Sequence, residues 1–359
     1  MASYLTQANF HYNVVMNFWN YFIDESALAS IFSKFPLWGL LIVIALVIAL
    51  LSKGADWLID GAVGLALKTK LPKIVIGATI LSLGTTAPEA FVSVMAAFMG
   101  TPGLALGNGV GSIIADTGLI FGLTAVIAAP PMDKWILNRT SNWQLGSAVL
   151  LVLLALSTYI FSPEGPTINR LMGLLLVALL VVYLIITYKW ARKRTHTGSE
   201  VEVSEKSKPL PIILLEFFGG LVLVIVASRL LVPAAVETAR RFGVPNDVIA
   251  ATMVALGTSL PELSTAIAAI RKGHPEITVG NIVGADVLNT LFVIGMAAIA
   301  MPLAVPINFF LLHFPAMLLV LIPFRIFISI DTKGSFRRWQ GAWLLAVYIC
   351  YIALLYIVR

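Results

Sequence analysis

Long apolar stretches separated by short polar gaps run through nearly the whole chain. Each stretch is on the order of 20 residues, the length an α-helix needs to cross a bilayer, whereas membrane-barrel strands would alternate over roughly 10 residues. The pattern predicts ten transmembrane helices, at approximately 36–67, 72–98, 103–129, 143–162, 168–190, 210–239, 246–270, 276–300, 303–328 and 339–358. Because the first and sixth are longer than an upright span, we expect them to tilt or to extend beyond the bilayer.

The composition is that of a membrane protein built from helices. Of the 359 residues, 59% are hydrophobic and 12% are charged, whereas about a quarter of the residues in a soluble domain are charged. We therefore expect an all-α, multi-pass integral membrane protein in contact with lipid. The single cysteine, Cys350, excludes an intrachain disulfide and a cysteine-based metal cluster.

Lysine and arginine residues gather in the gaps that follow odd-numbered spans, for example Lys68, Lys70 and Arg192. Because positively charged loops stay in the cytoplasm, we expect both termini to lie outside a plasma or cell membrane. This topology accounts for the net charge of +6, so the charge does not indicate nucleic-acid binding. Residues 1–34 lack signal-peptide features and are expected to form an extracellular or interfacial segment, and residues 191–209 a cytoplasmic linker.

One short motif occurs twice, as GTTAPE at residues 84–89 and as GTSLPE at 257–262. In the register that aligns Gly84 with Gly257, GNGVGS at 107–112 also aligns with GNIVGA at 280–285, without a gap. Two matches in one register indicate an internal duplication. The duplicated motif regions are 77–123 and 250–296.

The two copies are predicted to run in opposite directions through the membrane. They lie in the second and seventh predicted spans, so five crossings separate equivalent points, and an odd number of crossings inverts the second copy. We therefore predict two inverted five-helix repeats, 35–190 and 210–359, related by a pseudo-twofold axis in the membrane plane. Transporters of this design place one site near the midplane and open it alternately to each side.

Each hexapeptide concentrates oxygen atoms. A proline within a helix cannot hydrogen-bond the carbonyl four residues earlier, which here belongs to Gly84 or Gly257. Thr85 and Glu89 stand four residues apart on one helix face, and Thr258 and Glu262 do the same. A carboxylate, a hydroxyl and loosened carbonyls form the all-oxygen environment that hard cations such as Ca²⁺ and Na⁺ prefer.

A purely structural interpretation was weighed against this one. Proline, glycine, serine and threonine are also common in membrane helices as kinks and packing surfaces. That interpretation would suffice for one copy without its acid. Glu89 and Glu262 decide against it, because a carboxylate at bilayer depth is costly and by default marks a site or a pathway.

The two GN segments are predicted to contribute further side chains to the site. Ser112 and Asp116 stand four residues apart, and their mates in the second copy are Ala285 and Asn289. The first copy thus contributes a hydroxyl and an acid where the second contributes a methyl group and an amide. Asp286, whose mate is Ile113, has two open interpretations: it belongs to the edge of the site, or it hydrogen-bonds a break in its helix.

Together these segments resemble the cation/calcium exchanger superfamily, specifically its sodium/calcium exchanger branch. The paired GT[ST].PE and GN..G[SA] segments look like that family's two alpha repeats, and the resemblance extends over nearly all of the chain after residue 34. Proton-coupled relatives typically carry a glutamate soon after GN in the second segment, which this chain lacks, so the sodium-coupled type is favoured. Ile113 and Asp286 stand where family members commonly have asparagine.

The resemblance implies a set of cation ligands. The central divalent site of the family corresponds here to Ca²⁺ ligands Thr85, Glu89, Thr258 and Glu262. Its flanking sodium sites correspond to Ser82, Thr86, Ser112, Asp116, Ala255, Ser259, Ala285 and Asn289, the two alanines through their backbone carbonyls.

We therefore expect a secondary active antiporter, not an enzyme, that exchanges Ca²⁺ for Na⁺ by alternating access and needs no cofactor. Two neighbouring carboxylates repel each other unless a cation or proton is present. We therefore expect the protein to change between its inward- and outward-facing forms when the site is filled, but not when it is empty. The alternatives are a proton-coupled or Mg²⁺-selective exchanger of the same fold, a passive channel and an intramembrane hydrolase. The hydrolase would need an activated nucleophile and base, but none of the four histidines accompanies a motif.

Overall fold

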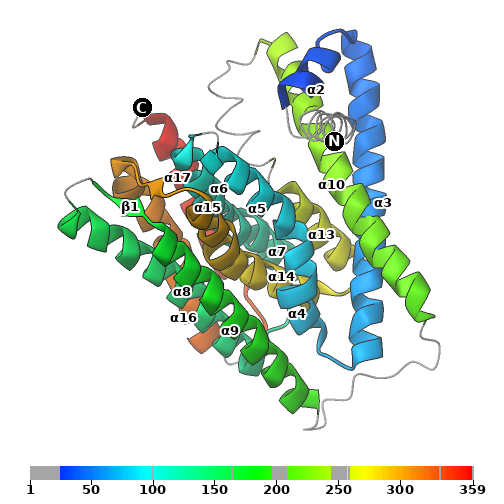
Figure 1. Cartoon of the computed structure of the whole chain (residues 1–359). Helices are drawn as coiled ribbons and strands as arrows, with labels where there is room; N and C mark the ends of the chain where they lie inside the picture. Colours follow the sequence, from blue (N-terminus) through cyan, green and yellow to red (C-terminus); the bar gives the residue numbers. More distant parts are fainter. Residues whose placement is uncertain are drawn as a thin grey trace, which may run out of the picture.

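The computed structural model describes residues 25–98, 100–162, 165–195, 208–243, 257, 259–330 and 333–357. This part of the chain is almost entirely helical (Figure 1). The first half contains α2 (Glu25–Phe32), α3 (Leu37–Thr69), α4 (Lys73–Ile76), η1 (Gly77–Leu81), α5 (Ser82–Phe98), α6 (Pro102–Ile114), η2 (Ala115–Phe121), α7 (Gly122–Ala128), α8 (Lys134–Phe161), β1 (Thr167–Ile168) and α9 (Arg170–Thr195). The second half contains α10 (Leu210–Arg241), α13 (Leu260–Arg271), α14 (Pro275–Leu288), η4 (Asn289–Ile294), α15 (Gly295–Ala300), β2 (Leu303–Ala304), η5 (Phe309–His313), α16 (Phe314–Ile330) and α17 (Arg338–Ile357).

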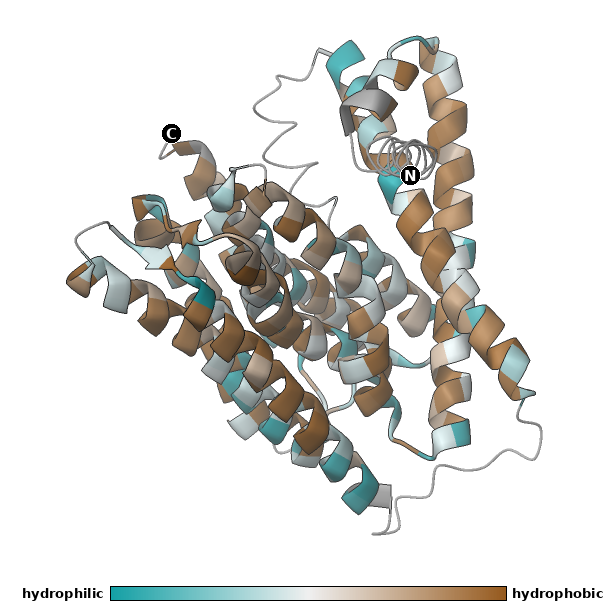
Figure 2. Ribbon diagram, viewed as in Figure 1, coloured by the Kyte–Doolittle hydropathy of each residue, from teal (hydrophilic) through white to brown (hydrophobic). Residues whose placement is uncertain are grey.

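Nine helical runs within the described residues are long and apolar enough to cross a membrane. They correspond to predicted spans one to six and eight to ten. The predicted seventh span, 246–270, lies partly outside the described residues, and α13 is its described portion. Hydrophobic residues dominate the helices in Figure 2, as expected of a protein whose outer surface meets lipid.

The fourth span begins earlier than the predicted start at residue 143. Helix α8 begins at Lys134, because the Asp133 side chain caps it by accepting hydrogen bonds from the backbone N–H groups of Trp135 and Ile136 at 3.1 and 3.3 Å. The polar residues before position 143 suggested a loop, but some of their side chains form hydrogen bonds within the helix. Thr140 and Ser141 donate to backbone carbonyls one turn earlier, at 3.1 and 2.5 Å.

The fifth and ninth spans begin two and six residues later than their approximate predicted starts at 168 and 303. Ile168 and Leu303–Ala304 lie in short antiparallel strands, in which Thr167–Ile168 pairs with Leu303–Ala304. The ninth helical run therefore begins at Phe309 and the fifth at Arg170. An apolar run alone does not distinguish a helix from a short strand, so the strand residues were assigned to the helices.

Helices α3 and α10 lie side by side along one side of the molecule (Figure 1). With 33 and 32 residues each is about 50 Å long, longer than the roughly 30 Å hydrocarbon core. Their backbones approach closely, since a Cβ added at Gly220 would lie 2.4 Å from the backbone nitrogen of Leu58. Such close backbone contact is typical of small residues at membrane helix interfaces.

A central block of helices carries both motif regions, with α8 and α9 on the side away from α3 and α10 (Figure 1). Helix α14 packs directly on α4 and η1. A Cβ at Gly280 would lie 2.0 Å from the carbonyl oxygen of Ile74, so this glycine is required for the contact. The tight packing joins the two halves of the chain at the centre of the block.

Loops of one half also pair with loops of the other half. β2, after α15, pairs with β1, before α9. In the corresponding place of the other half, Pro131, after α7, forms a bridge with Ser335, before α17. Each half thus pairs the loop after its third span with the loop before the last span of the other half.

Candidate cation-binding site

The two motif glutamates lie inside the central block. Glu89 is on α5 and Glu262 is in the first turn of α13, with 2% and 0% of their surfaces exposed. Glu89 lines the same narrow cavity as Pro261, which directly precedes Glu262. The fold therefore brings together two acids that lie in different halves of the sequence.

The described residues of the two hexapeptides differ in how they relate to a helix. Helix α5 continues through Pro88, which sits in its interior. In the second copy a helix begins at the motif: Ser259 is the residue before α13, and Pro261 lies in the first turn. A proline is tolerated in the first turn because the N–H it lacks has no partner within the helix there.

Glu89 is held by side chains of α6. The Ser112 hydroxyl donates a hydrogen bond of 2.8 Å to Oε1 of Glu89. The Asn108 amide donates to the Glu89 carbonyl at 3.3 Å and to the Ser93 hydroxyl at 2.9 Å. The other carboxylate oxygen, Oε2, has no hydrogen-bond partner among the described residues.

Glu262 has no equivalent support. Neither of its carboxylate oxygens has a hydrogen-bond partner in the described part of the chain. Ala285 occupies the position equivalent to Ser112 and has no hydroxyl to donate. Thr85 from the first hexapeptide lies beside the Glu262 carboxylate, so the two motifs approach each other.

Asp116 and Asn289, which are mates in the two repeats, face each other. The Asn289 amide donates to Oδ2 of Asp116 at 3.5 Å, whereas Oδ1 of each residue has no described partner. Asp116 lies in the π-helical segment η2, and Asn289 begins the equivalent segment η4. Such wide turns occur frequently at functional sites, and the sequence carries no local signature for them.

Several buried oxygens around these acids have no described hydrogen-bond partner. They belong to Thr86, Glu89, Asp116, Ser259, Glu262 and Asn289. Leaving so many polar atoms unpaired is costly in a buried environment. Carboxylate, hydroxyl and amide oxygens are the donors that hard cations use. Within the described chain no three acidic, histidine or cysteine side chains gather closely enough to hold a metal by themselves, so a cation here would depend on the neutral oxygens as well.

The remaining predicted ligands divide into two groups. Ser82 and Ala285 are fully buried, and a Cβ at Gly284, next to Ala285, would lie 2.6 Å from the Ser82 hydroxyl. Ala255 and Thr258 lie outside the described residues. The ligand assignments as a whole remain predictions.

The side chain of Asp286 does not hydrogen-bond a break in its own helix, and its place at the edge of the site stays a prediction. Its Oδ2 accepts hydrogen bonds from the Thr117 hydroxyl at 2.5 Å and from the Gln144 amide at 2.6 Å, and the same amide also donates to Thr117 at 3.2 Å. These are side chains of other helices and not a break in α14. Gln144, Thr117 and Asn108 were not predicted as partners of the acids. Asn108 and Thr117 had a signal, since their mates Asn281 and Thr290 repeat them in the second copy, whereas Gln144 had none.

A narrow cavity of about 60 Å³ reaches Glu89 from between the motifs and α10. Pro88, Pro261 and Ser228 are among its lining residues. Since one water molecule needs roughly 10–15 Å³ of such space, the cavity is large enough for a few water molecules. It is a candidate access path to the acids.

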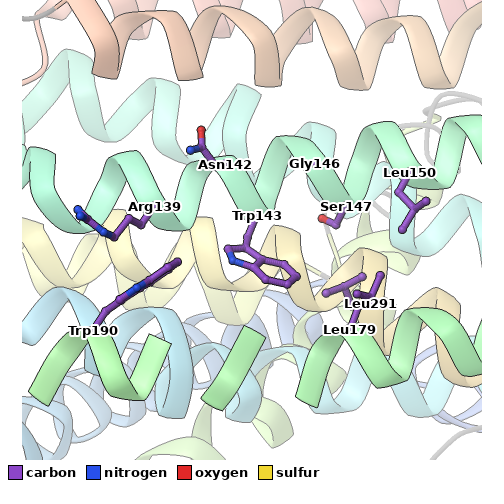
Figure 3. Close-up of a pocket in the computed structure, with 9 residues that line it drawn as sticks. All are labelled: Arg139, Asn142, Trp143, Gly146, Ser147, Leu150, Leu179, Trp190 and Leu291. Carbon is purple, nitrogen blue, oxygen red and sulfur yellow. The ribbon is translucent and has the colours of Figure 1, made fainter. Parts of the chain in front are cut away.

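A larger cavity of about 360 Å³ lies between α8 and α9 (Figure 3). Its lining includes Arg139, the polar side chains of Asn142 and Ser147, two tryptophans and three leucines, and no acid. The Arg139 guanidinium lies 4.0 Å from the ring centre of Trp135 and 5.9 Å from that of Trp190. A wall with a fixed positive charge and no carboxylate does not suit a cation, so this cavity is not the candidate site.

Charged residues connect α3 and α4 to the region between α13 and α14. Lys272 forms an ion pair of 2.7 Å with Asp60 of α3, and Lys73 one of 3.3 Å with Glu276. His274 lies 2.9 Å from the Lys73 ammonium. Partial burial and then the neighbouring Lys73 charge lower the pKa of His274 from its ordinary value.

Comparison with known proteins places the chain in a family. The model of the sodium/calcium exchanger protein family matches residues 39–189 and 212–357. Inner membrane protein YrbG of Escherichia coli (strain K12) is 31% identical over 322 residues, which cover 88% of this chain and 96% of the relative. Sodium/calcium exchanger MaX1 of Methanosarcina acetivorans is 27% identical, with coverage of 88% and 98%. The structure of the sodium/calcium exchanger from Methanococcus jannaschii aligns with a TM-score of 0.75 at 26% identity, covering 89% of this chain and 99% of that one.

The helical membrane architecture and these matches define an integral, multi-pass ion transporter and not an enzyme. The chain belongs to the sodium/calcium exchanger protein family, within the cation/calcium exchanger superfamily. The resemblance inferred from the two motifs is thereby confirmed.

Proposed function

We propose that this protein is a secondary active antiporter that exchanges Ca²⁺ for Na⁺ across a cell membrane, with no cofactor. The observation that carries the proposal is the meeting of Glu89 and Glu262, one from each motif, among buried oxygens that lack described partners. The family match and the names of the relatives MaX1 and the Methanococcus jannaschii exchanger support the same pair of ions.

The chemistry of the site favours Ca²⁺ over Mg²⁺. Ca²⁺ accepts six to eight oxygen ligands in flexible geometry, whereas Mg²⁺ demands a near-ideal octahedron and retains several waters. The proposed central ligands are Thr85, Glu89, Thr258 and Glu262. The proposed flanking Na⁺ ligands are Ser82, Thr86, Ser112, Asp116, Ala255, Ser259, Ala285 and Asn289.

Electrostatic repulsion couples the two ions in this proposal. Glu89 and Glu262 are buried close together, so a state with both charged and no cation is unfavourable. Na⁺ and Ca²⁺ draw on overlapping oxygens and therefore displace one another. Only loaded sites cross between the two access states, which makes exchange obligatory.

The exchanger is proposed to alternate between two access states by movement of α3 and α10 against the central block. At the α13–α14 end of the block, the Asp60–Lys272 ion pair joins α3 to α13. Toward the other end of α10, the narrow cavity beside Ser228 reaches Glu89. A barrier at one end and a path at the other are what one state of an alternating-access cycle requires.

We further propose the two inverted five-helix repeats at 35–190 and 210–359, with residues 1–34 outside and 191–209 as the cytoplasmic linker. The exchanged loop pairings after α7 and α15 support a pseudo-twofold relation between the halves. The π-helical segments η2 and η4 at equivalent positions support it as well.

Flux in proteoliposomes tests the function. Vesicles loaded with Na⁺ and diluted into Na⁺-free buffer at clamped pH should take up external Ca²⁺, and vesicles without the Na⁺ gradient should not. Uptake that follows an imposed proton gradient would support the proton-coupled exchanger instead. Ca²⁺ entry that is independent of both gradients would indicate a channel.

A further inference from the structure

The hydrogen-bonded group of Asp286, Gln144 and Thr117 is not used by the proposed ligand set. All three side chains are buried, with exposed fractions of 1%, 2% and 0%. Gln144 lies on α8, outside both motif regions, and Asp286 lies on α14. A buried carboxylate is rare in a membrane protein and by default marks a function, so the position of this one requires an explanation.

The internal repeat supplies a comparison within the same chain. In the register that aligns the two motifs, Asp286 corresponds to Ile113 and Gln144 corresponds to Met317. Ile113 and Met317 are both fully buried in the hydrophobic core. One half therefore has an acid and an amide where the other half has two apolar side chains of similar size. Packing at these positions does not require polar groups, and the amide occurs together with the acid.

The hydrogen bonds hold the Asp286 carboxylate in place. Two donors from different elements, Thr117 of η2 and Gln144 of α8, converge on Oδ2. Hydrogen bonds donated to a carboxylate favour its charged form and oppose the effect of burial, which favours the neutral form. Glu262 differs most, because it has no described donor for either oxygen, whereas Asp286 and Glu89 each have one oxygen with donors and one, Oδ1 or Oε2, without a described partner.

Asp286 is nevertheless close to the proposed site. It directly follows Ala285, a proposed Na⁺ ligand, on α14, and its partner Thr117 directly follows Asp116 on η2. Asn289, which donates to Asp116, lies one turn after Asp286 on the same helical run. The Asp286 carboxylate is thus near the proposed cation site, but the side chains of Thr117 and Gln144 orient it.

We propose that Asp286 is a fixed negative charge beside the cation site, that Gln144 is the positioning residue that holds it there, and that together they raise the preference of the site for divalent over monovalent cations. The energy of a cation in the field of a fixed charge is proportional to the charge of the cation. If removing the fixed charge raises the dissociation constant of one Na⁺ by a certain factor, it therefore raises the dissociation constant of Ca²⁺ by the square of that factor. This inference rests on the proposed exchange function and names a residue pair that sets its selectivity.

Substitution of Asp286 by asparagine removes the charge and keeps the shape. In calorimetric titrations of the purified protein, Asp286→Asn should raise the dissociation constant of the first Na⁺ about threefold and that of Ca²⁺ about tenfold. Gln144→Leu should shift both constants in the same direction by smaller factors. Thr140→Val, on the same helix one turn before Gln144, should leave both constants unchanged.

A double variant repeats the test without depending on how Asp286→Asn folds. Gln144→Met with Asp286→Ile copies the residues of the other half into this one, so its packing should be tolerated. It should show the same squared relation between the Ca²⁺ and Na⁺ constants.

Three outcomes would overturn the inference. Unchanged constants would mean that Asp286 carries no charge that the cations experience. Equal factors for both ions would indicate a structural effect, and complete loss of Ca²⁺ binding would make Asp286 a ligand. Failure of the exchange proposal is distinguishable, because wild-type vesicles would then show no Na⁺-driven Ca²⁺ uptake, whatever the variants do.

Discussion

The two copies of the GT..PE motif have nearly the same sequence but different surroundings. In the first copy the helix continues through Pro88, and Ser112 donates a hydrogen bond to Glu89. In the second copy a helix starts at the motif, and Glu262 has no described hydrogen-bond partner, because Ala285 replaces the serine. The duplication supplies the acids in pairs, and in the proposed site the differences between the copies would decide how much each acid depends on a cation.

The largest effect is expected from removing either acid. Glu89→Gln and Glu262→Gln should each reduce Na⁺-driven Ca²⁺ uptake at least about 100-fold, because a buried charge that loses its partner costs roughly 3–5 kcal/mol. Isotope flux into proteoliposomes measures the loss. Glu216→Gln is the control, since Glu216 pairs with Lys208 near the end of α10 and far from the motifs in sequence. Normal flux in both site variants would show that the acids do not form the transport site.

Placing the same residue at positions 112 and 285 would reduce the difference between the copies. Ala285→Ser gives Glu262 a donor like the one that Ser112 gives Glu89, which stabilises the empty site. Because a hydrogen bond to a charged group is worth about 1.5–3 kcal/mol, the Ca²⁺ dissociation constant should rise about tenfold. Ser112→Ala should make Glu89 resemble Glu262 and should weaken Na⁺ binding more than Ca²⁺ binding. Identical Ca²⁺ dissociation constants in Ala285→Ser and wild type would show that the missing hydroxyl does not explain the difference between Glu262 and Glu89.

A smaller effect is expected at the ion pair between α3 and α13. Asp60→Asn removes the partner of Lys272 and should make the α13 end more accessible. Because a partly exposed ion pair is worth about 0.2–1 kcal/mol, backbone hydrogen exchange at the end of α13 should accelerate about two- to fivefold. Lys208→Gln breaks the Lys208–Glu216 pair, which does not involve α13, and should not change that exchange. Equal acceleration in both variants would remove the support for a barrier at this end.

The smallest expected effect concerns pH. The lowered pKa of His274 means that the folded protein binds a proton less readily than the unfolded chain. The stability contributed by neutral His274 is therefore fully present above its ordinary pKa of 6.5 and is lost as the pH falls below that value. Between pH 7 and pH 5 the melting temperature of wild type should fall slightly more than that of His274→Gln. An equal fall in both proteins would exclude His274 as the source.

The membrane class and the paired motifs were predictable because they depend on local patterns. Apolar runs located the spans, and the common register of the two motif copies located Glu89 and Glu262. The start of α8 was missed because Thr140 and Ser141 bond to their own helix, which makes a polar stretch look like a loop. The Gln144–Asp286 contact joins residues 142 positions apart, and no local spacing predicts which side chains meet over such a distance.

Calcium binding to the purified protein tests the shared site most directly. Calorimetric titration without Na⁺ should give one tightly bound Ca²⁺ per wild-type chain, released by Na⁺, and no tight binding in either Glu89→Gln or Glu262→Gln. Retention of a tight Ca²⁺ site in either single variant would contradict a site built jointly by the two copies.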